Sequence, residues 1–217
     1  DGLKRMVERQ ENVFYYITLL NENYAMPGLT PGTEEQIIKG MYLCKPGAEG
    51  DKRVQLLGSG TILRESLEAQ KLLATDWGVQ ADVWSCPSFN ELTRDGQDAE
   101  RWNLLHPLEA PRVPFVAQQL GQRSGPVVAS TDYMKNYAEQ IRAFIPAGRT
   151  YKVLGTDGFG RSDFRSKLRE HFEVNRHYIA VAALKALAEE GQLPLAKVAE
   201  AIQKYGIQTE KNNPLHA

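Results

Sequence analysis

The chain has 217 residues, of which 42% are hydrophobic and 24% charged, a composition typical of a globular domain with its own core. Its formal net charge of -1 provides no long-range field that would favour nucleic acid or an anionic membrane. Two cysteines, Cys44 and Cys86, exclude a disulfide-rich scaffold and favour a reducing compartment, for which the cytoplasm is the default. The longest apolar runs are too short to cross a bilayer.

The first part of the chain predicts the end of one unit. Residues 1–10 carry a helix-like scatter of apolar side chains, and residues 13–20, rich in β-branched and aromatic side chains, predict a strand. Asp1 is not a translation start, so we interpret the chain as part of a longer protein.

A linker follows this first part. Its breakers occur within a few positions of one another, at Pro27, Gly28, Pro31 and Gly32. They place a domain boundary between about residues 25 and 47. We assign residues 1–45 to a preceding domain plus linker and residues 46–217 to a second domain. We expect that second domain to fold after trimming to about residue 45.

Beyond the linker, short apolar strands alternate with amphipathic helices. The predicted strands are residues 54–57, 81–86, 125–130 and 151–154. The predicted helices are residues 62–77, 89–92, 101–105, 131–145, 164–172, 178–188 and 194–205. Because parallel strands need helical crossovers, this alternation predicts an α/β fold: a three-layer α/β/α sandwich with a mostly parallel sheet. A site in such a fold lies beyond the carboxyl ends of the strands.

The motifs at these strand ends do not form a catalytic pattern. Residues 58–60 (GSG) lack the third glycine of a dinucleotide site and the lysine of a P-loop, so they predict a tight turn rather than an anion site. Residues 94–98 with Glu100 predict a capped, solvated helix start rather than a calcium loop. The histidines and serines match no metal or nucleophile motif, and Cys86 predicts a buried side chain. We therefore predict no catalytic, cofactor-binding or metal residue in this chain.

The loop of residues 155–163 (GTDGFGRSD) joins the last strand to a helix. Its glycines permit unusual backbone angles, and Ser162 or Asp163 is expected to accept hydrogen bonds from the next helix. Arg161 either braces the loop through Asp157 or Asp163, which we favour, or reaches a neighbouring domain or subunit. We interpret Asp157, Arg161, Ser162 and Asp163 as a candidate interdomain or partner loop.

Long strings of the sequence carry a family resemblance. They are LGTDGFGRSDFRSKLREHF (154–172), LLNENYAMP (19–27), RDGQDAERWN (94–103) and NPLHA (213–217). Together they resemble the carboxyl-terminal part of the homodimeric type of pyruvate dehydrogenase E1 component, in the transketolase-like thiamine diphosphate superfamily. The resemblance covers the whole chain and implies a transketolase-like C-terminal domain preceded by the end of the pyrimidine-binding domain.

The resemblance also implies a function for the full-length enzyme. That enzyme would oxidatively decarboxylate pyruvate on thiamine diphosphate with Mg²⁺ and reductively acetylate the lipoyl group of the E2 dihydrolipoyl acetyltransferase. Its cofactor would lie between other domains of a cytoplasmic homodimer. This chain would be structural, with the rest of the E1 subunit, the second E1 subunit and the peripheral subunit-binding domain of E2 as its partners.

Two alternatives stay open at this point. One is an independent small-ligand or anion-binding α/β module, with a pocket between residues 58–61 and 157–163. The other is the same domain of another 2-oxoacid dehydrogenase or of a transketolase, because substrate choice is made in domains outside this chain.

Overall fold

The structure is a computed structural model that describes residues 1–20, 22–25 and 28–216. Its centre is a five-stranded sheet of order β1-β3-β2-β4-β5. The strands are β1 (Tyr42–Lys45), β2 (Arg53–Gly58), β3 (Gln80–Ser85), β4 (Val127–Ser130) and β5 (Tyr151–Leu154). All neighbouring pairs are parallel except β1 and β3, which are antiparallel.

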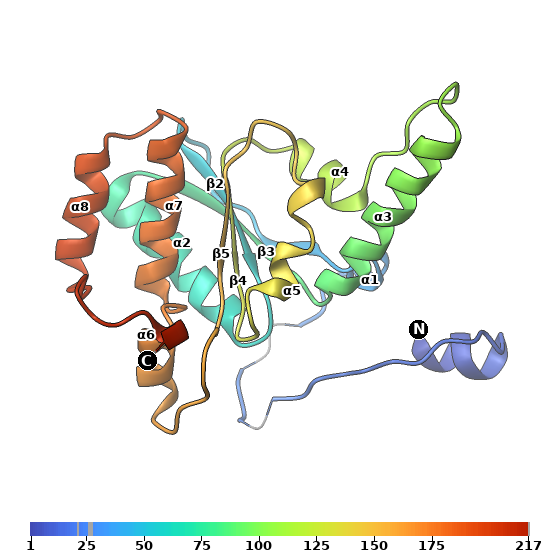
Figure 1. Ribbon diagram of the computed structural model, residues 1–217, viewed down its shortest axis with the longest axis horizontal. Coiled ribbons are helices and arrows are strands. Elements are labelled where there is room, and N and C mark those ends of the chain that lie inside the picture. The colour runs from blue at the N-terminus through green and yellow to red at the C-terminus, as the bar shows by residue number, and fades with distance from the viewer. Residues whose placement is uncertain (21, 26–27, 217) are drawn as a thin grey trace.

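Helices cover both faces of this sheet (Figure 1). One face carries α2 (Ile62–Trp77), α7 (Arg176–Glu189) and α8 (Leu195–Lys204), with the short α6 (Arg165–His171) before α7. The other face carries α3 (Phe89–Leu105), α4 (Phe115–Gly121) and α5 (Asn136–Glu139), with α1 (Glu34–Ile38) nearby. The predicted three-layer α/β/α class is therefore confirmed.

Alternation along the central strands explains the two cores. In β2, Val54 and Leu56 pack towards α2 and α7, whereas Leu57 packs towards α3 and α4. Successive side chains of a strand point to opposite faces, so a strand covered on both faces is apolar throughout. Each of these three side chains is 0% exposed, and such burial is worth roughly 1.5–3 kcal/mol per large aliphatic side chain.

A buried carboxylate on β3 links several segments near the amino ends of the strands. Asp82 on β3 is 0% exposed and accepts hydrogen bonds from Arg53 at 2.9 Å, Arg123 at 3.0 Å and Gln55 at 3.0 Å. The backbone N–H of Gly47 donates to it as well, at 2.9 Å. Burial alone raises the pKa of Asp82, but these donors outweigh burial and hold the pKa below its ordinary value.

The amino-terminal segment differs from the prediction. Residues 13–20 do not form a strand, because no strand within the described ranges pairs with their backbone, and they run extended away from the domain (Figure 1). Residues 1–10 are helical in part, as predicted, and most of that part is a short π-helix, η1 (Lys4–Glu8). Pro27, one of the predicted linker breakers, lies outside the described residues.

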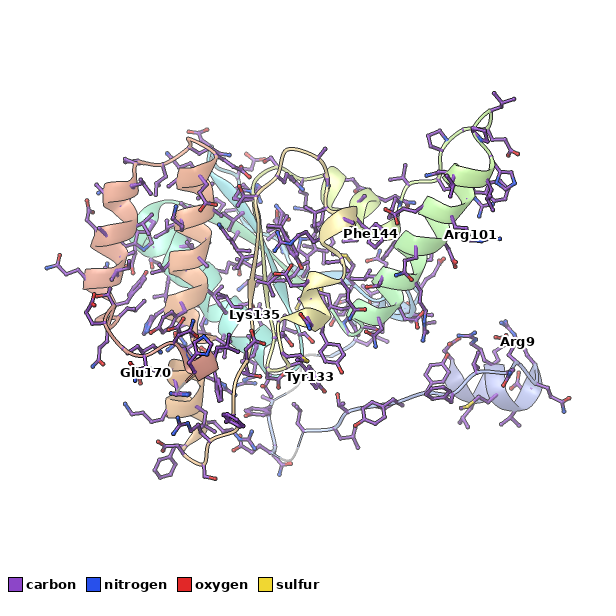
Figure 2. The ribbon with its side chains drawn as sticks, viewed as in Figure 1. Arg9, Arg101, Tyr133, Lys135, Phe144 and Glu170 are labelled. Atoms are coloured by element: carbon purple, nitrogen blue, oxygen red, sulfur yellow. The ribbon has the colours of Figure 1, made fainter. Side chains whose placement is uncertain are left out.

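Two further predictions of local structure are wrong. Residues 94–98 do not start a helix: they lie inside α3, which begins after Ser88, whose Oγ accepts from the N–H of Glu91 at 3.2 Å. A glycine is needed at position 96 despite its cost within a helix, because a Cβ there would lie 2.4 Å from the ring of Phe144, which packs beside α3 (Figure 2).

The helix predicted for residues 131–145 is instead broken into pieces. Thr131 Oγ1 accepts from the N–H of Tyr133 at 3.2 Å, and this local turn delays the helix until α5. A 3-10 turn, η2 (Arg142–Phe144), follows α5. Tyr133 and Tyr137 consequently remain 39% and 41% exposed.

Strand β1 and helix α1 are additional elements inside the predicted linker. Met41, just before β1, is 0% exposed and belongs to the core on the α3 side. Within the described ranges, no helix is both long and apolar enough to pass through a bilayer.

Candidate interdomain surface at the strand ends

The turn after β2 is occupied by a carboxylate. Gly60 has a φ of 56°, and a Cβ added to it would lie 2.8 Å from Oδ1 of Asp132. The other oxygen of Asp132 accepts from Thr61 Oγ1 at 3.1 Å. Because a carboxylate against the turn repels a phosphate, this geometry suits a structural turn and offers no seat for the diphosphate of a cofactor.

The first half of the 155–163 loop is fixed to the segment after β4. Asp157 Oδ1 accepts from the N–H of Lys135 at 3.0 Å, and its Oδ2 lies 3.6 Å from Nζ of the same lysine. The N–H of Thr156 donates to the carbonyl of Tyr133 at 2.9 Å. A Cβ on Gly158, whose φ is 100°, would lie 2.3 Å from the carbonyl oxygen of Pro214, in the 3-10 turn η3 (Pro214–His216). The backbone of this half is therefore held on two sides.

The second half of the loop faces outward. Asp163 accepts from the N–H of Phe164 at 2.7 Å, just before α6, while the side chain of Ser162 has no hydrogen-bond partner among the described residues. Arg161 is exposed and forms no hydrogen bond or ion pair with the part of the chain that the structure describes. The bracing pair that we favoured, from Arg161 to Asp157 or Asp163, does not form. Phe159 and Phe164 are each 81% exposed.

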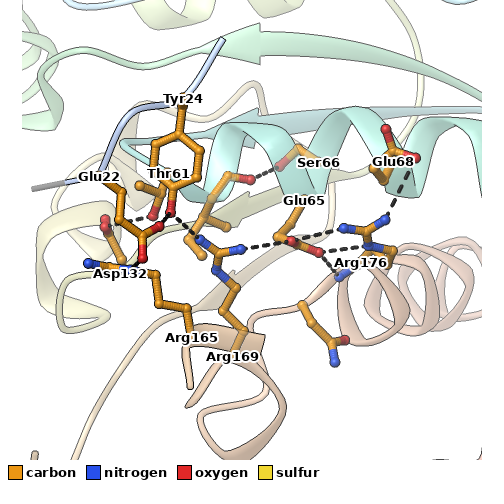
Figure 3. Close-up of polar contacts among 12 residues, drawn as sticks. Glu22, Tyr24, Thr61, Glu65, Ser66, Glu68, Asp132, Arg165, Arg169 and Arg176 are labelled. Carbon is orange, nitrogen blue, oxygen red and sulfur yellow. Dashed lines mark hydrogen bonds and ion pairs between the residues drawn. The ribbon is translucent and has the colours of Figure 1, made fainter. Parts of the chain in front are cut away.

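A charge network next to this loop connects the amino-terminal segment to the domain (Figure 3). Its centre is Glu65 on α2, whose side chain is 5% exposed. Arg176 donates to Glu65 from its backbone N at 3.0 Å and from Nε at 2.9 Å, and Arg169 donates at 3.2 Å. Burial alone raises the pKa of Glu65, but the bonds from Arg176 outweigh it, so the pKa lies below its ordinary value.

Arg169 extends the network to the incoming chain. Its Nη2 donates to the hydroxyl of Tyr24 at 3.3 Å, and that hydroxyl donates to Glu22 at 2.5 Å. Glu22 also pairs with Arg165 on α6. Arg64 lies over the ring of Tyr24, 4.8 Å from its centroid. These partners are separated by up to 145 positions, so no local sequence pattern could have indicated them.

The remaining polar candidates serve packing. Ser130 is buried with its Oγ 3.0 Å from Oγ of Ser66. Burial raises the pKa of the Cys86 thiol. The described residues hold no cluster of three or more metal-ligating side chains. A hollow of about 680 Å³ between the end of α2 and α8 is lined by charged side chains together with Trp77 and Pro194, and it lies at the opposite edge of the sheet, beside Lys52.

The fold is that of a three-layer α/β/α domain with a mostly parallel sheet. Comparison with known proteins identifies the family of this domain. Residues 40–175 match the family model described as "Transketolase-like TK C-terminal domain". The chain therefore belongs to that family. A crystal structure of transketolase from Pichia stipitis shares the fold, with a TM-score of 0.50 and 18% identity over 77% of this chain and 21% of that chain.

Curated relatives of the chain within this family share one name. The chain is 60% identical to the "Pyruvate dehydrogenase E1 component" of Pseudomonas aeruginosa and 58% identical to that of Escherichia coli, over 99% of its length in each case. The resemblance to the carboxyl-terminal region of that component is thus confirmed. The chain spans 24% of the length of these relatives.

Proposed function

We propose that this chain is the carboxyl-terminal domain of a pyruvate dehydrogenase E1 component. The observation that supports this is identity of 60% over 99% of the chain to a relative of that name, of which the chain spans 24%. The full-length enzyme would oxidatively decarboxylate pyruvate on thiamine diphosphate and Mg²⁺ and reductively acetylate the lipoyl group of E2. We place it in the cytoplasm as a homodimer, as the resemblance implies.

The role that we propose for this chain within the enzyme is structural. At the strand ends, the acidic groups are used internally: Asp132 against the β2 turn, Asp157 on Lys135 and Asp163 on the N–H of Phe164, just before α6. Apolar side chains and Arg161 point outward instead. This arrangement favours packing against other parts of the enzyme over chemistry.

The candidate loop takes a more specific role in this proposal. Asp157 and Asp163 shape the loop from within, and Arg161 and Ser162 contact the rest of the E1 subunit or a partner. We also propose that the domain begins before Gly40, because β1 ends at Lys45 and a boundary there would separate this strand from its sheet.

The first test is an activity measurement on the full-length protein. We expect it to decarboxylate pyruvate in the presence of thiamine diphosphate and Mg²⁺, and we expect the 217-residue chain to have no such activity. Decarboxylation of a different 2-oxoacid in preference to pyruvate would replace this proposal by another member of the superfamily.

The second test is a calorimetric titration of the 217-residue chain. Thiamine diphosphate with Mg²⁺ is expected to give no binding heat, and heat from this ligand would instead support an independent ligand-binding module. The peripheral subunit-binding domain of E2 is titrated in parallel. Heat in that experiment would assign an E2 surface to this chain, whereas its absence would restrict the contacts of the chain to the E1 dimer.

A further inference from the structure

Exposed apolar side chains gather at the carboxyl edge of the sheet. They come from the segment after β4 and from the loop before α6, and we call them the strand-end apolar face: Tyr133, Met134, Tyr137, Phe159 and Phe164. Their exposed fractions are 39%, 49%, 41%, 81% and 81%. Two of these side chains, Tyr133 and Tyr137, are in ring contact, and exposed apolar side chains that lie in contact are more characteristic of an interaction site than single exposed ones.

The backbone that carries Tyr133 and Tyr137 is held in place by hydrogen bonds. The segment of Tyr133 and Lys135 is bonded to Thr156 and Asp157, and the rings of Tyr133 and Tyr137 are 5.4 Å apart between centroids. Figure 2 shows Tyr133 and Lys135 close together at this end of the sheet. At the two tyrosines, a partner would therefore meet a preformed surface and would lose little conformational entropy on ordering it.

The incoming chain reaches the domain beside this face. Phe164 directly precedes Arg165, which pairs with Glu22, and Arg169 one turn later holds Tyr24. Upstream of that anchor, the segment of residues 13–20 exposes further apolar side chains: Phe14 at 88%, Tyr16 at 88%, Ile17 at 73% and Leu19 at 88%. An extended apolar segment without a pairing strand lacks the sheet on which it would dock.

We propose that the part of the same E1 subunit that precedes residue 1 docks on the strand-end apolar face, and that an acidic side chain of that part forms an ion pair with Arg161. This inference rests on the proposed function, because the curated relatives extend far beyond the 24% of their length that the chain spans. The Glu22 and Tyr24 contacts fix the connecting chain beside this face, which favours the preceding part of the same subunit over a second copy as the occupant.

The test is photocrosslinking in the full-length subunit, with benzoylphenylalanine in place of Phe159. This position is 81% exposed, so the probe is expected to leave the domain folded. We expect a crosslink within one subunit, with no doubling of mass under denaturing conditions and with its mapped partner upstream of residue 1. The matched control carries the same probe at Leu195, which is 62% exposed at the start of α8, and is expected not to form that crosslink.

Several outcomes would overturn the inference. A product of doubled mass would assign the face to the second subunit, and a crosslink only to added E2 would assign it to that partner. The absence of any crosslink from position 159, with the full-length enzyme still decarboxylating pyruvate, would show that the face stays open. Failure of the proposed function is distinguishable, because it appears as absent pyruvate decarboxylation in the unmodified full-length protein.

A second variant examines the charge. Arg161→Gln in the full-length subunit is expected to increase side-chain oxidation of Phe159 and Phe164 by hydroxyl radicals, because the docked part is held less tightly. The 217-residue chain with the same substitution should show no change, since the face is open there already. Equal oxidation of the two aromatic side chains in both lengths of wild-type protein would contradict the proposal.

Discussion

Asp82 and Glu65 are both buried carboxylates held by two arginines, but their networks end differently. The donors to Asp82 come from residues 47–123, so the network is complete within the domain. The network of Glu65 continues through Arg169 to Tyr24 and Glu22, upstream of the sheet. A buried carboxylate paired with arginines therefore has two uses here. At one end of the strands it stabilises contacts within the domain, and at the other end it links the domain to the segment that precedes it.

The largest effect is expected from removing residues 1–45. This truncation removes the outer members of the Glu65 network together with β1 and the buried Met41, and it also leaves Gly47 near a free end. Loss of a buried methionine alone costs about 2–5 kcal/mol, so we expect the cooperative thermal transition to be lost or strongly lowered. Removal of residues 1–32 is the matched control and should lower the unfolding free energy by only about 1 kcal/mol, because the lost contacts of Glu22 and Tyr24 are exposed or only partly buried and β1 and Met41 are kept.

That pair of truncations decides the domain boundary. A chain that begins at residue 46 and unfolds with the same transition as one that begins at residue 33 would restore a boundary near residue 45.

Asp82→Ala should give the next largest effect. It leaves Arg53 and Arg123 without their shared partner near a fully buried site, and breaking such a pair costs about 3–5 kcal/mol. Urea denaturation measures the loss. Asp51→Ala, an exposed aspartate nearby, should change stability by less than about 0.5 kcal/mol. A loss of unfolding free energy below about 1 kcal/mol for Asp82→Ala would mean that the Asp82 network contributes little to the stability of the domain.

Glu65→Gln is expected to cost about 2 kcal/mol, less than the change at Asp82 because the Arg176 side chain is 40% exposed and is partly solvated. Hydrogen exchange should also increase in residues 22–25 and in α6, which the Asp82 variant should leave unchanged. Unchanged exchange in both segments would show that Glu65 does not support the connection to the incoming chain.

The pH dependence of Glu65→Gln sharpens this result. Since the folded pKa of Glu65 lies below its ordinary value of 4.5, its stabilisation is fully present above that pH and is lost as the pH falls through the folded pKa. The difference in unfolding free energy between wild type and variant should therefore shrink below about pH 4.5. A difference that stays constant down to pH 3 would exclude the ionised carboxylate as its source.

Tyr24→Phe should give the smallest effect. The ring stays over Arg64, and only the hydroxyl bonds with Arg169 and Glu22 are lost, at a cost below about 1 kcal/mol. We expect faster hydrogen exchange around residue 24 with an unchanged thermal midpoint. Glu34→Gln, at an exposed glutamate, is the control. An increase in hydrogen exchange of the same size in that control would show that the Tyr24 hydroxyl does not hold the amino-terminal segment on the domain.

The central sheet was predictable because its strands are apolar on both faces and are separated by helices with a clear period. Strand β1 was not, because it is a short edge strand whose side chains are only partly buried. The strand predicted for residues 13–20 failed for a different reason: the composition is right, but a strand needs a pairing partner, and no described segment of the chain pairs with these residues.

The candidate loop was located correctly as a strand-to-helix connection, but the behaviour of its residues depended on distant parts of the chain. Asp157 turns to Lys135 rather than to Arg161, and Gly158 is needed because of Pro214. The Glu65 network likewise joins residues more than a hundred positions apart. Charge pairing over such separations is set by the fold and is invisible to local patterns.

The contact between Gly158 and Pro214 has a consequence for the order in which the protein is made. A ribosome synthesises the loop well before the turn at residues 214–216 that supports it. The nascent chain must extend past Leu215 before the loop acquires that support. The residues of the strand-end face are therefore synthesised well before the turn that packs against Gly158. Chains whose translation stops before residue 214 should have the loop without this contact.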